Sequence, residues 1–352
     1  MAERKLGVGV IGCGGIARGA HFPNYARNPR VRLVAVADVD RERARAAAEQ
    51  WGVDAYYDDY RDLLARADLE AVSVTTPVFA HAEPAIAAME AGKHVLCEKP
   101  IARTLAEADA MVAAAERNGV LFTMGYQPRF SRLWDQTKRV LDEGLIGKLL
   151  AVNLVSCGRA ALPQPWFLER SKSGGGVMMD WGIYTAYMIN WLAGKVRAVY
   201  AVTRAFRNAY KGGATMVENV DVEDTGVATL EFENGAIGTW YLTWAGVTGH
   251  GYTSFDGTEG SLLMRAGQEA APLVYSSKLD DPEYLRGWRK LAFTELSLAE
   301  QHYRKLDHLV AAALDGSPLV MTGSDGRDAL ELIQAIYRSA ETGQRVTLPL
   351  SR

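Results

Sequence analysis

A Glu-Lys-Pro triplet at residues 98–100 directly follows a short apolar run. Proline lacks the N–H group that a β-ladder needs and favours extended geometry at the residue before it, so a strand that reaches the triplet should end there and present Lys99. In an open α/β sheet, ligands bind at the carboxyl ends of the strands. Lys99 is therefore a candidate for chemistry at a ligand. The alternative is an exposed ion pair that contributes little to stability.

A glycine-rich turn with GxGxxA spacing lies near the start of the sequence and consists of Gly12, Gly14, Gly15, Ile16 and Ala17. Glycines in such a turn let the backbone approach a pyrophosphate, and the exposed N–H groups at a helix start stabilise its charge. The spacing predicts a dinucleotide-binding turn, and a plain glycine-rich turn is the alternative.

An acidic residue, Asp38, lies 21 positions beyond Ala17, at the end of the next apolar run. A carboxylate at this spacing binds the ribose hydroxyls of the adenosine. Because it would repel a 2′-phosphate, Asp38 favours NAD over NADP, although Arg41 and Arg43 would soften that repulsion. A helix-capping role for Asp38 is the alternative.

A third group of candidate residues lies in the stretch TTPVFAH at residues 75–81, at the end of the apolar run 69–76 and just beyond it. At a strand end, Thr76, Pro77 and His81 would lie near the nicotinamide side of a cofactor. Thr-Pro is equally an ordinary helix start, and on spacing alone His81 is more often a structural helix residue.

Asp180 and Tyr184 lie in an apolar helical run that three glycines precede. Residues four apart share one face of a helix, and Tyr187 and Trp191 continue this stripe. Taken alone, an aspartate near a helix start serves the helix dipole and a tyrosine on an apolar face packs in a core.

The elements that must position these residues alternate over residues 5–126. Apolar, β-branched runs at 5–12, 31–38, 69–76, 94–99 and 120–126 indicate strands, and alanine-rich runs at 14–27, 40–52, 80–92 and 105–119 indicate helices. This order predicts a doubly wound parallel sheet of the Rossmann type. We assign residues 1–125 to a dinucleotide-binding domain.

Beyond residue 126 the runs become longer and have a period of two, and Asn234-Gly235 between two of them is a hairpin signal. The second half is therefore expected to be an α+β domain with a mainly antiparallel open sheet and helices on one side. We assign residues 126–352 to a domain for substrate binding and oligomerisation.

The composition excludes several classes of protein. A net charge of -3 gives no basic field for nucleic acid, and no run is apolar and long enough to cross a membrane. The three cysteines lie far apart without metal-binding spacing, so we expect no metal site and a reducing compartment, the cytoplasm.

The chain resembles the glucose-fructose oxidoreductase / inositol dehydrogenase family, often called Gfo/Idh/MocA, over nearly its whole length. The resemblance is carried by the stretches GCGGIA, TTPVFAH, AGKHVLCEKP, SGGGVMMDWGIY, DVEDTGVATLEFENGAIGT and GTEGSL. It implies catalytic roles for Lys99 and Asp180, with Tyr184 where inositol dehydrogenases have histidine. It also implies that Glu98 faces the cofactor. A tyrosine at position 184 resembles the pattern of the glucose-fructose oxidoreductase and dimeric dihydrodiol dehydrogenase branches. This resemblance makes inositol a less favoured substrate.

The implied chemistry is the oxidation of a secondary alcohol. NAD accepts the hydride, so protein groups must handle the hydroxyl proton. A Lys99 cation would stabilise the Tyr184 phenolate and let this tyrosine act as general base, while Asp180 orients Lys99 or a substrate hydroxyl. Arg129, after the run at 120–126, and Trp166, a flat apolar face for a sugar ring, are further candidates for substrate binding. The alternatives are a surface arginine and a core or interface tryptophan.

We therefore expect an NAD-dependent dehydrogenase of a sugar, a cyclic polyol or a related ring hydroxyl. The rival hypotheses are an enzyme of the same fold that cleaves glycosides while recycling NAD, and a regulator that senses sugar and cofactor without turnover. Trp240, Leu242 and Trp244 share one side of a predicted strand by period-two alternation. Because helices are expected on only one face of the second sheet, its other face should lack cover, and exposed apolar patches of that size mark interfaces. A homodimer or homotetramer through the C-terminal sheet is therefore expected.

Overall fold

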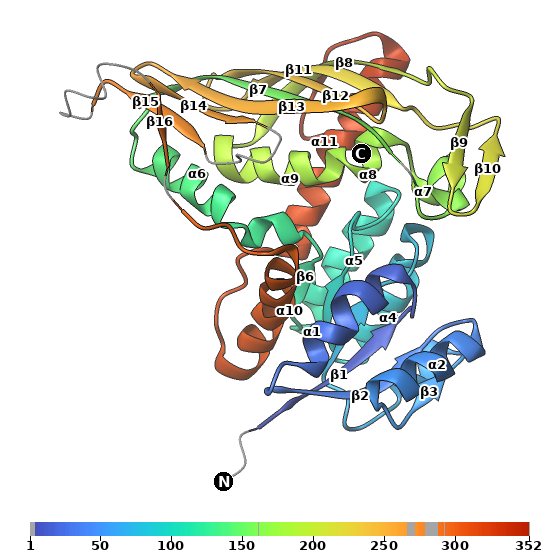
Figure 1. Ribbon diagram of the computed structural model, residues 1–352. Coiled ribbons are helices and arrows are strands. Elements are labelled where there is room, and N and C mark those ends of the chain that lie inside the picture. Colours follow the sequence, from blue (N-terminus) through green and yellow to red (C-terminus); the bar gives the residue numbers. More distant parts are fainter. Residues whose placement is uncertain (1–3, 161, 266–271, 279–287, 292, 352) are drawn as a thin grey trace. The chain divides into compact units, whose positions relative to one another are not determined.

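The computed structural model describes residues 4–160, 162–265, 272–278, 288–291 and 293–351. The chain forms two compact units, Met1–Phe130 with Leu296–Arg327 and Ser131–Glu295 with Asp328–Arg352 (Figure 1). No helix in the described ranges is both long and apolar enough to span a bilayer.

The first unit is built on a parallel sheet, as the alternating pattern predicts. Its six strands run in the order β3-β2-β1-β4-β5-β6, and every pair is parallel. They are β1 (Leu6–Ile11), β2 (Val31–Ala37), β3 (Tyr56–Tyr57), β4 (Ala71–Val74), β5 (His94–Cys97) and β6 (Phe122–Met124). Residues of β1, β4 and β5 are almost all buried, which is why these runs are apolar without alternation.

The helices of this unit are η1 (Ala17–His21), α1 (Phe22–Ala26), α2 (Arg41–Trp51), α3 (Tyr60–Leu64), η2 (Val78–Ala80), α4 (Ala82–Glu90), α5 (Leu105–Asn118), η3 (Gln127–Phe130) and α10 (Leu298–Asp315). Local signals fix their ends. Asp40 caps α2, and Thr104 forms a capping box with Glu107 at the start of α5. The short β3 and α3 were not expected from the sequence.

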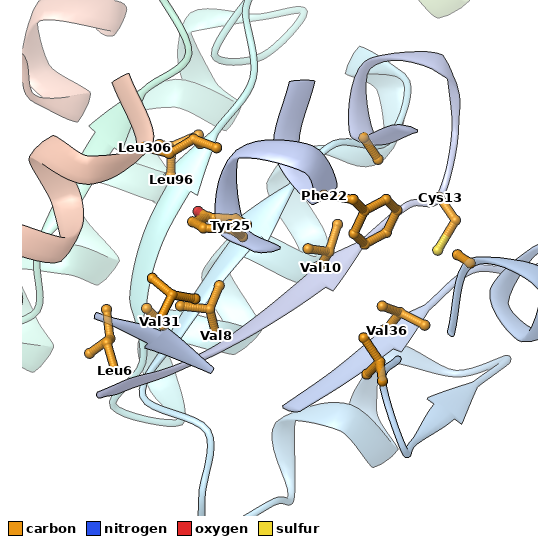
Figure 2. Close-up of a cluster of buried hydrophobic side chains, with 14 of the residues drawn as sticks. Leu6, Val8, Val10, Cys13, Phe22, Tyr25, Val31, Val36, Leu96 and Leu306 are labelled. Carbon is orange, nitrogen blue, oxygen red and sulfur yellow. The ribbon is translucent and has the colours of Figure 1, made fainter. Parts of the chain in front are cut away.

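Helix α10 belongs to the first unit although it lies far along the chain. Leu306, Leu309 and Val310 form one stripe of α10 and are buried in the same cluster as Leu6, Tyr25 and Leu96. Figure 2 shows Leu306 beside Leu96 of β5. The division into 1–125 and 126–352 therefore differs from the contact pattern, because residues 296–327 pack with the first unit.

The second unit contains a nine-stranded sheet in the order β16-β15-β14-β13-β7-β12-β11-β8-β17 and a two-stranded sheet of β9 and β10. Its strands are β7 (Leu149–Arg159), β8 (Val196–Arg204), β9 (Ala209–Gly212), β10 (Thr215–Glu218), β11 (Thr225–Phe232), β12 (Ile237–Thr243), β13 (Ala245–Gly257), β14 (Gly260–Arg265), β15 (Leu273–Ser276), β16 (Arg289–Lys290) and β17 (Val346–Thr347). The β7–β12 pair is parallel and the other pairs are antiparallel. The expected hairpin at Asn234-Gly235 joins β11 to β12.

The helices of the second unit are α6 (Arg132–Asp142), η4 (Pro165–Leu168), α7 (Arg170–Ser173), α8 (Val177–Asp180) and α9 (Gly182–Ala193). Helix α11 (Gly323–Thr342) begins in the first unit and continues in the second. In Figure 1, α9 runs along one face of the large sheet.

Trp240, Leu242 and Trp244 all point into the core of the second unit, at 1%, 2% and 0% exposure. The stripe predicted from the alternation of β12 is thus the covered face of the sheet. Ile237 on the same strand is 62% exposed and belongs to the other face.

Candidate active site

The glycine turn after β1 is shaped for close approach. Gly12 has φ +94, and a Cβ atom there would lie 2.8 Å from the backbone N of Thr76 and 2.9 Å from the backbone C of Thr75, so this position requires glycine. At Gly14 and Gly15 a Cβ would meet nothing within 4 Å. The turn therefore leaves open space over exposed backbone at a helix start, which fits the pyrophosphate of a dinucleotide.

Asp38 follows β2, and its carboxylate is nearly buried at 8% exposure. One oxygen, Oδ2, accepts a hydrogen bond of 2.8 Å from the backbone N–H of Cys13, so the acid is fastened to the glycine turn. Arg43 Nη1 lies 3.0 Å from Oδ1 and 3.3 Å from Oδ2. The carboxylate thus stands where the sequence predicts it, with a guanidinium beside it.

The loop after β4 is joined to the glycine turn and to the Glu-Lys-Pro segment. Thr75 Oγ1 donates to the carbonyl oxygen of Gly12 at 2.5 Å. His81 is buried, with Nδ1 2.8 Å from the carbonyl oxygen of Pro100 and Nε2 2.9 Å from that of Thr76. His81 therefore bridges two strand-end loops, and its predicted contact with a cofactor would have to replace one of these bonds.

Lys99 lies just beyond β5, at the carboxyl edge of the parallel sheet and partly buried. The neighbouring Glu98 N–H extends the ladder by donating to the Val74 carbonyl at 3.0 Å. Strand pairing therefore persists until the residue before Lys99, and then stops as the following proline predicts.

The Glu98 carboxylate is buried and forms a cluster with two other side chains of the first unit. His21 Nε2 lies 2.8 Å from its Oε1, and the Lys305 ammonium of α10 donates to the same oxygen. Burial alone would raise the pKa of Glu98, but the Lys305 charge and the His21 hydrogen bond bring it below the usual range. The role of Glu98 toward a cofactor stays a prediction, since the structure places its carboxylate in this buried cluster.

The second unit places Asp180 at the end of α8 and Tyr184 in the first turn of α9. Both side chains are partly exposed, whereas Tyr187 further along the stripe is buried. The helical run that follows the three glycines is divided at Trp181, which keeps helical backbone angles.

The glycines before α8 allow an unusually close approach to a buried acid. A Cβ at Gly176 would lie 1.8 Å from the Glu223 carbonyl oxygen, and one at Gly175 would lie 2.0 Å from the Tyr337 hydroxyl. The Glu223 carboxylate accepts hydrogen bonds from the N–H groups of Gly176 and Met178 at 2.9 and 3.0 Å and from the Tyr337 hydroxyl at 2.8 Å. Burial raises the pKa of Glu223, although these donors oppose the rise. Glu223 thus fixes the start of the helix that carries Asp180.

The remaining candidates lie in different units. Arg129 is in η3 of the first unit, next to Phe130, whose ring lies 5.4 Å from the His308 ring of α10. Trp166 is in η4 of the second unit and stacks on Phe167 at 3.8 Å between ring centroids. Substrate contacts of Arg129 and Trp166 stay predictions. Within the described ranges, His, Cys, Asp and Glu side chains form no group of three or more that could hold a metal ion.

Sequence reasoning did not find His21, Lys305 or Glu223. Lys305 did leave a signal, because it lies four residues before Leu309 on the apolar side of an amphipathic helix, where a lysine needs a partner. Glu223 lies in the stretch DVEDTG, which carried the family resemblance but no assigned role.

Two family models match the chain. Residues 6–126 match the oxidoreductase family with an NAD-binding Rossmann fold, and residues 134–263 match the GFO/IDH/MocA C-terminal domain. The chain belongs to the Gfo/Idh/MocA oxidoreductase family. The glycine turn and Asp38 of this member are therefore parts of an NAD-binding domain.

Individual members of the family are similar to this chain over most of its length. Levoglucosan dehydrogenase of Pseudarthrobacter phenanthrenivorans is 32% identical over 289 residues, which is 74% of each chain. Myo-inositol 2-dehydrogenase of Thermotoga maritima is 29% identical over 97% of this chain and 98% of its own. A solved structure of levoglucosan dehydrogenase in complex with NADH and levoglucosan has a TM-score of 0.88 at 26% identity, covering 99% of this chain and 100% of that one.

The buried histidine of the Glu98 cluster predicts a pH dependence. Burial and the Lys305 charge lower the pKa of His21 to about 4. Since an unfolded histidine titrates at about 6.5, the stability that neutral His21 contributes is present above that pH and is lost as the pH falls toward 4. We expect His21→Gln to flatten the fall in unfolding free energy between pH 6 and pH 5 by at most about 1.4 kcal/mol per pH unit.

Urea unfolding at pH 7, 6 and 5 measures this slope, with a variant at the exposed His250 of the second unit as control. A His21→Gln slope identical to that of the unmodified protein would contradict the assignment.

Proposed function

We propose that this family member is an NAD-dependent dehydrogenase that transfers a hydride between a ring hydroxyl of a sugar, cyclic polyol or glycoside and the nicotinamide. The observation that carries the proposal is the position of Lys99. It follows β5, and the glycine turn follows β1, with β4 as the single strand between them. Two strand spacings amount to roughly 10 Å, so Lys99 stands within the length of a dinucleotide whose pyrophosphate lies on the turn.

The proton chemistry falls to this chain's own side chains. NAD, when bound, supplies the hydride acceptor. In this proposal Lys99 donates a hydrogen bond to the reacting oxygen and stabilises its developing negative charge. Tyr184 takes the hydroxyl proton as general base and returns it in the reverse reaction, and Asp180 orients Lys99 or a neighbouring hydroxyl.

Support for a sugar or polyol comes from the relatives. The levoglucosan and myo-inositol dehydrogenases similar to this chain are named for a sugar derivative and a cyclic polyol. Support for NAD over NADP comes from Asp38, since a buried carboxylate fastened to the glycine turn opposes a 2′-phosphate. The guanidinium of Arg43 beside it offsets part of this repulsion, so NADP is expected as a poorer cofactor and not as an excluded one.

The test of the proposal is a panel of monosaccharides, inositols, anhydrosugars and glycosides, each followed by NADH absorbance with NAD and with NADP. We expect steady NADH formation with at least one cyclic substrate and a preference of about tenfold or more for NAD.

Other outcomes assign a different function. Cleavage of a glycoside without accumulation of NADH would identify the NAD-recycling reaction. Binding of sugar and NAD without turnover would identify a sensor. A preference for NADP would contradict the role given to Asp38.

Removal of the lysine charge tests the first proposed role. Lys99→Met should lower kcat by about a thousandfold or more, because the oxygen loses its charged donor, while NADH binding changes little. Lys93→Met is the matched control, since Lys93 precedes β5 at its opposite end and donates to the Leu69 carbonyl at 2.9 Å. Near-normal turnover by Lys99→Met would remove Lys99 from the mechanism.

Removal of one hydroxyl tests the second role. Tyr184→Phe should lower kcat by about a hundredfold with little change in Tm, because the ring still packs and only the proton carrier is lost. Tyr187→Phe removes a hydroxyl from the next turn of α9 and should leave kcat nearly unchanged. Tyr184→His should recover part of the rate with a lower pH optimum. Unaltered kcat in Tyr184→Phe would leave Tyr184 as a packing residue.

An oligomer through the large sheet is the third part of the proposal. The registers place Val202, Val227, Tyr241, Val155 and Tyr252 directly opposite one another across β8, β11, β12, β7 and β13. Val202, Val227 and Tyr252 are 39%, 50% and 42% exposed. A continuous apolar row of this length on an uncovered sheet face is typical of a homodimer or homotetramer interface.

We expect sedimentation to show a dimer or tetramer and Val227→Glu to shift it toward monomer, because the substitution places a charge at the centre of the apolar row. Met216→Glu on β10, where the methionine is 64% exposed, is the control and should leave the assembly intact. A monodisperse monomer at micromolar concentration would contradict this part.

A further inference from the structure

The helical segment that carries Asp180 and Tyr184 exposes one face. Of residues 175–189, all of which the structure describes, every residue is buried except Asp180, Trp181, Tyr184 and Thr185. Trp181 has helical backbone angles, and its backbone N–H donates to the Val177 carbonyl at 3.0 Å, so the helical spacing continues from α8 into α9. Positions i, i+1, i+4 and i+5 fall within about 140° around a helix, so these four side chains form one patch.

Trp181 is the large apolar side chain of this patch. Asp180 and Tyr184 already have proposed roles at a hydroxyl, whereas Trp181 has none. Sites for small ligands combine aromatic surface with a few polar groups that fix the orientation of the ligand. An indole offers a flat apolar face and one N–H donor, which suits a ring with C–H groups on one side and hydroxyls at its rim.

Two contacts hold the Trp181 ring in place. It forms a T-shaped pair with Trp244, with 6.3 Å between ring centroids and 89° between the planes. A Cβ at Gly158 of β7 would lie 3.6 Å from Cη2 and 3.7 Å from Cζ3 of the Trp181 ring, so β7 approaches this ring with its backbone. The core tryptophans Trp240 and Trp244 are 1% and 0% exposed, whereas Trp181 keeps part of its surface accessible. Trp181 is therefore supported by the core without being enclosed in it.

We propose that Trp181 is a specificity-determining residue whose indole packs against the ring of a cyclic substrate. The contact selects a pyranose or cyclitol that presents ring C–H groups on one side. An open-chain polyol makes the same contact less well, because it must first lose conformational freedom. The inference rests on the proposed function, in which Asp180 and Tyr184 act at a hydroxyl of that ring.

Trp181→Leu and Trp181→Phe remove the indole stepwise and test the inference. With a ring substrate of the protein, we expect Trp181→Leu to raise KM by about tenfold or more and to change kcat by less than about threefold, because the ring loses its platform and the proton-transfer groups remain. Trp181→Phe keeps an aromatic face and should retain part of the affinity. KM for NAD should stay within about threefold in both variants.

Two controls separate substrate contact from folding. Trp288, 49% exposed at the β16 edge of the large sheet, lies outside the patch, and Trp288→Leu should leave kcat and KM unchanged. Ile189 is buried further along α9, and Ile189→Ala should lower Tm at least as much as Trp181→Leu without raising the substrate KM. If KM rises equally in Ile189→Ala, or stays near that of the unmodified protein in Trp181→Leu, Trp181 has only a packing role and the inference is wrong.

A second measurement needs no turnover. Saturation-transfer difference NMR with NADH present, so that no alcohol is oxidised, compares myo-inositol, methyl glucoside and open-chain sorbitol as ligands. We expect the ring C–H protons of at least one of the two rings to show several times less saturation in Trp181→Leu than in the unmodified protein, while sorbitol shows no such difference. Equal ring signals in the two proteins, or none in either, would overturn the inference. If the unmodified protein binds a ring but oxidises no sugar or polyol, the proposed function fails and this comparison still decides the role of Trp181.

Discussion

The burial of one carboxylate at the end of a parallel strand constrains much of the first unit. Glu98 can stay ionised there only with a cation in contact, and that cation comes from α10, about two hundred positions along the chain. The same carboxylate requires glycine at 125 and holds His21 at the end of η1. One charge therefore joins the first helix, the fifth and sixth strands and a C-terminal helix around the turn that carries Lys99.

The second unit also contains a buried carboxylate close to a proposed catalytic segment. Glu223 is also buried, but its hydrogen bonds come from backbone N–H groups and a tyrosine hydroxyl. The Arg170 guanidinium lies farther away, at 4.0 Å from Oε2. The contacts of Glu223 leave room only for glycine at 175 and 176, and they fix the start of α8 ahead of Asp180. Each segment that carries a proposed catalytic residue is thus held by a buried carboxylate, Glu98 beside Lys99 and Glu223 at the start of α8. Functional groups keep their positions when the elements that carry them are fixed by such contacts.

The sequence predicted the parts of this architecture that depend on local patterns. The parallel strands, the glycine turn, the hairpin at Asn234-Gly235 and the end of β5 before Pro100 all follow from period, turn chemistry and proline geometry. Strand β3 was missed because two residues carry no period. The packing of α10 was missed for a different reason: an amphipathic helix records that it has an apolar side but not which of two cores covers that side.

The residues of the candidate site also fall into those that local sequence patterns predict and those that only the folded chain reveals. Residues fixed by spacing, such as Gly12 and Asp38, lie where their motif predicts. Lys305 and Glu223 act through contacts between segments far apart in sequence, so only the folded chain reveals them. The alternation of β12 correctly grouped Trp240, Leu242 and Trp244 on one side, whereas only the packing of the second unit shows that this side is the covered one.

The proposed function gives Lys99, Asp180 and Tyr184 roles at a single hydroxyl beside the nicotinamide. A crystal structure of the protein with NADH and a cyclic sugar that it oxidises tests this most directly. We expect one substrate oxygen to lie within hydrogen-bond distance, about 2.6–3.2 Å, of both the Lys99 ammonium and the Tyr184 hydroxyl, with the carbon that bears it facing the nicotinamide. A sugar bound beside the nicotinamide with neither side chain on the reacting oxygen would contradict it.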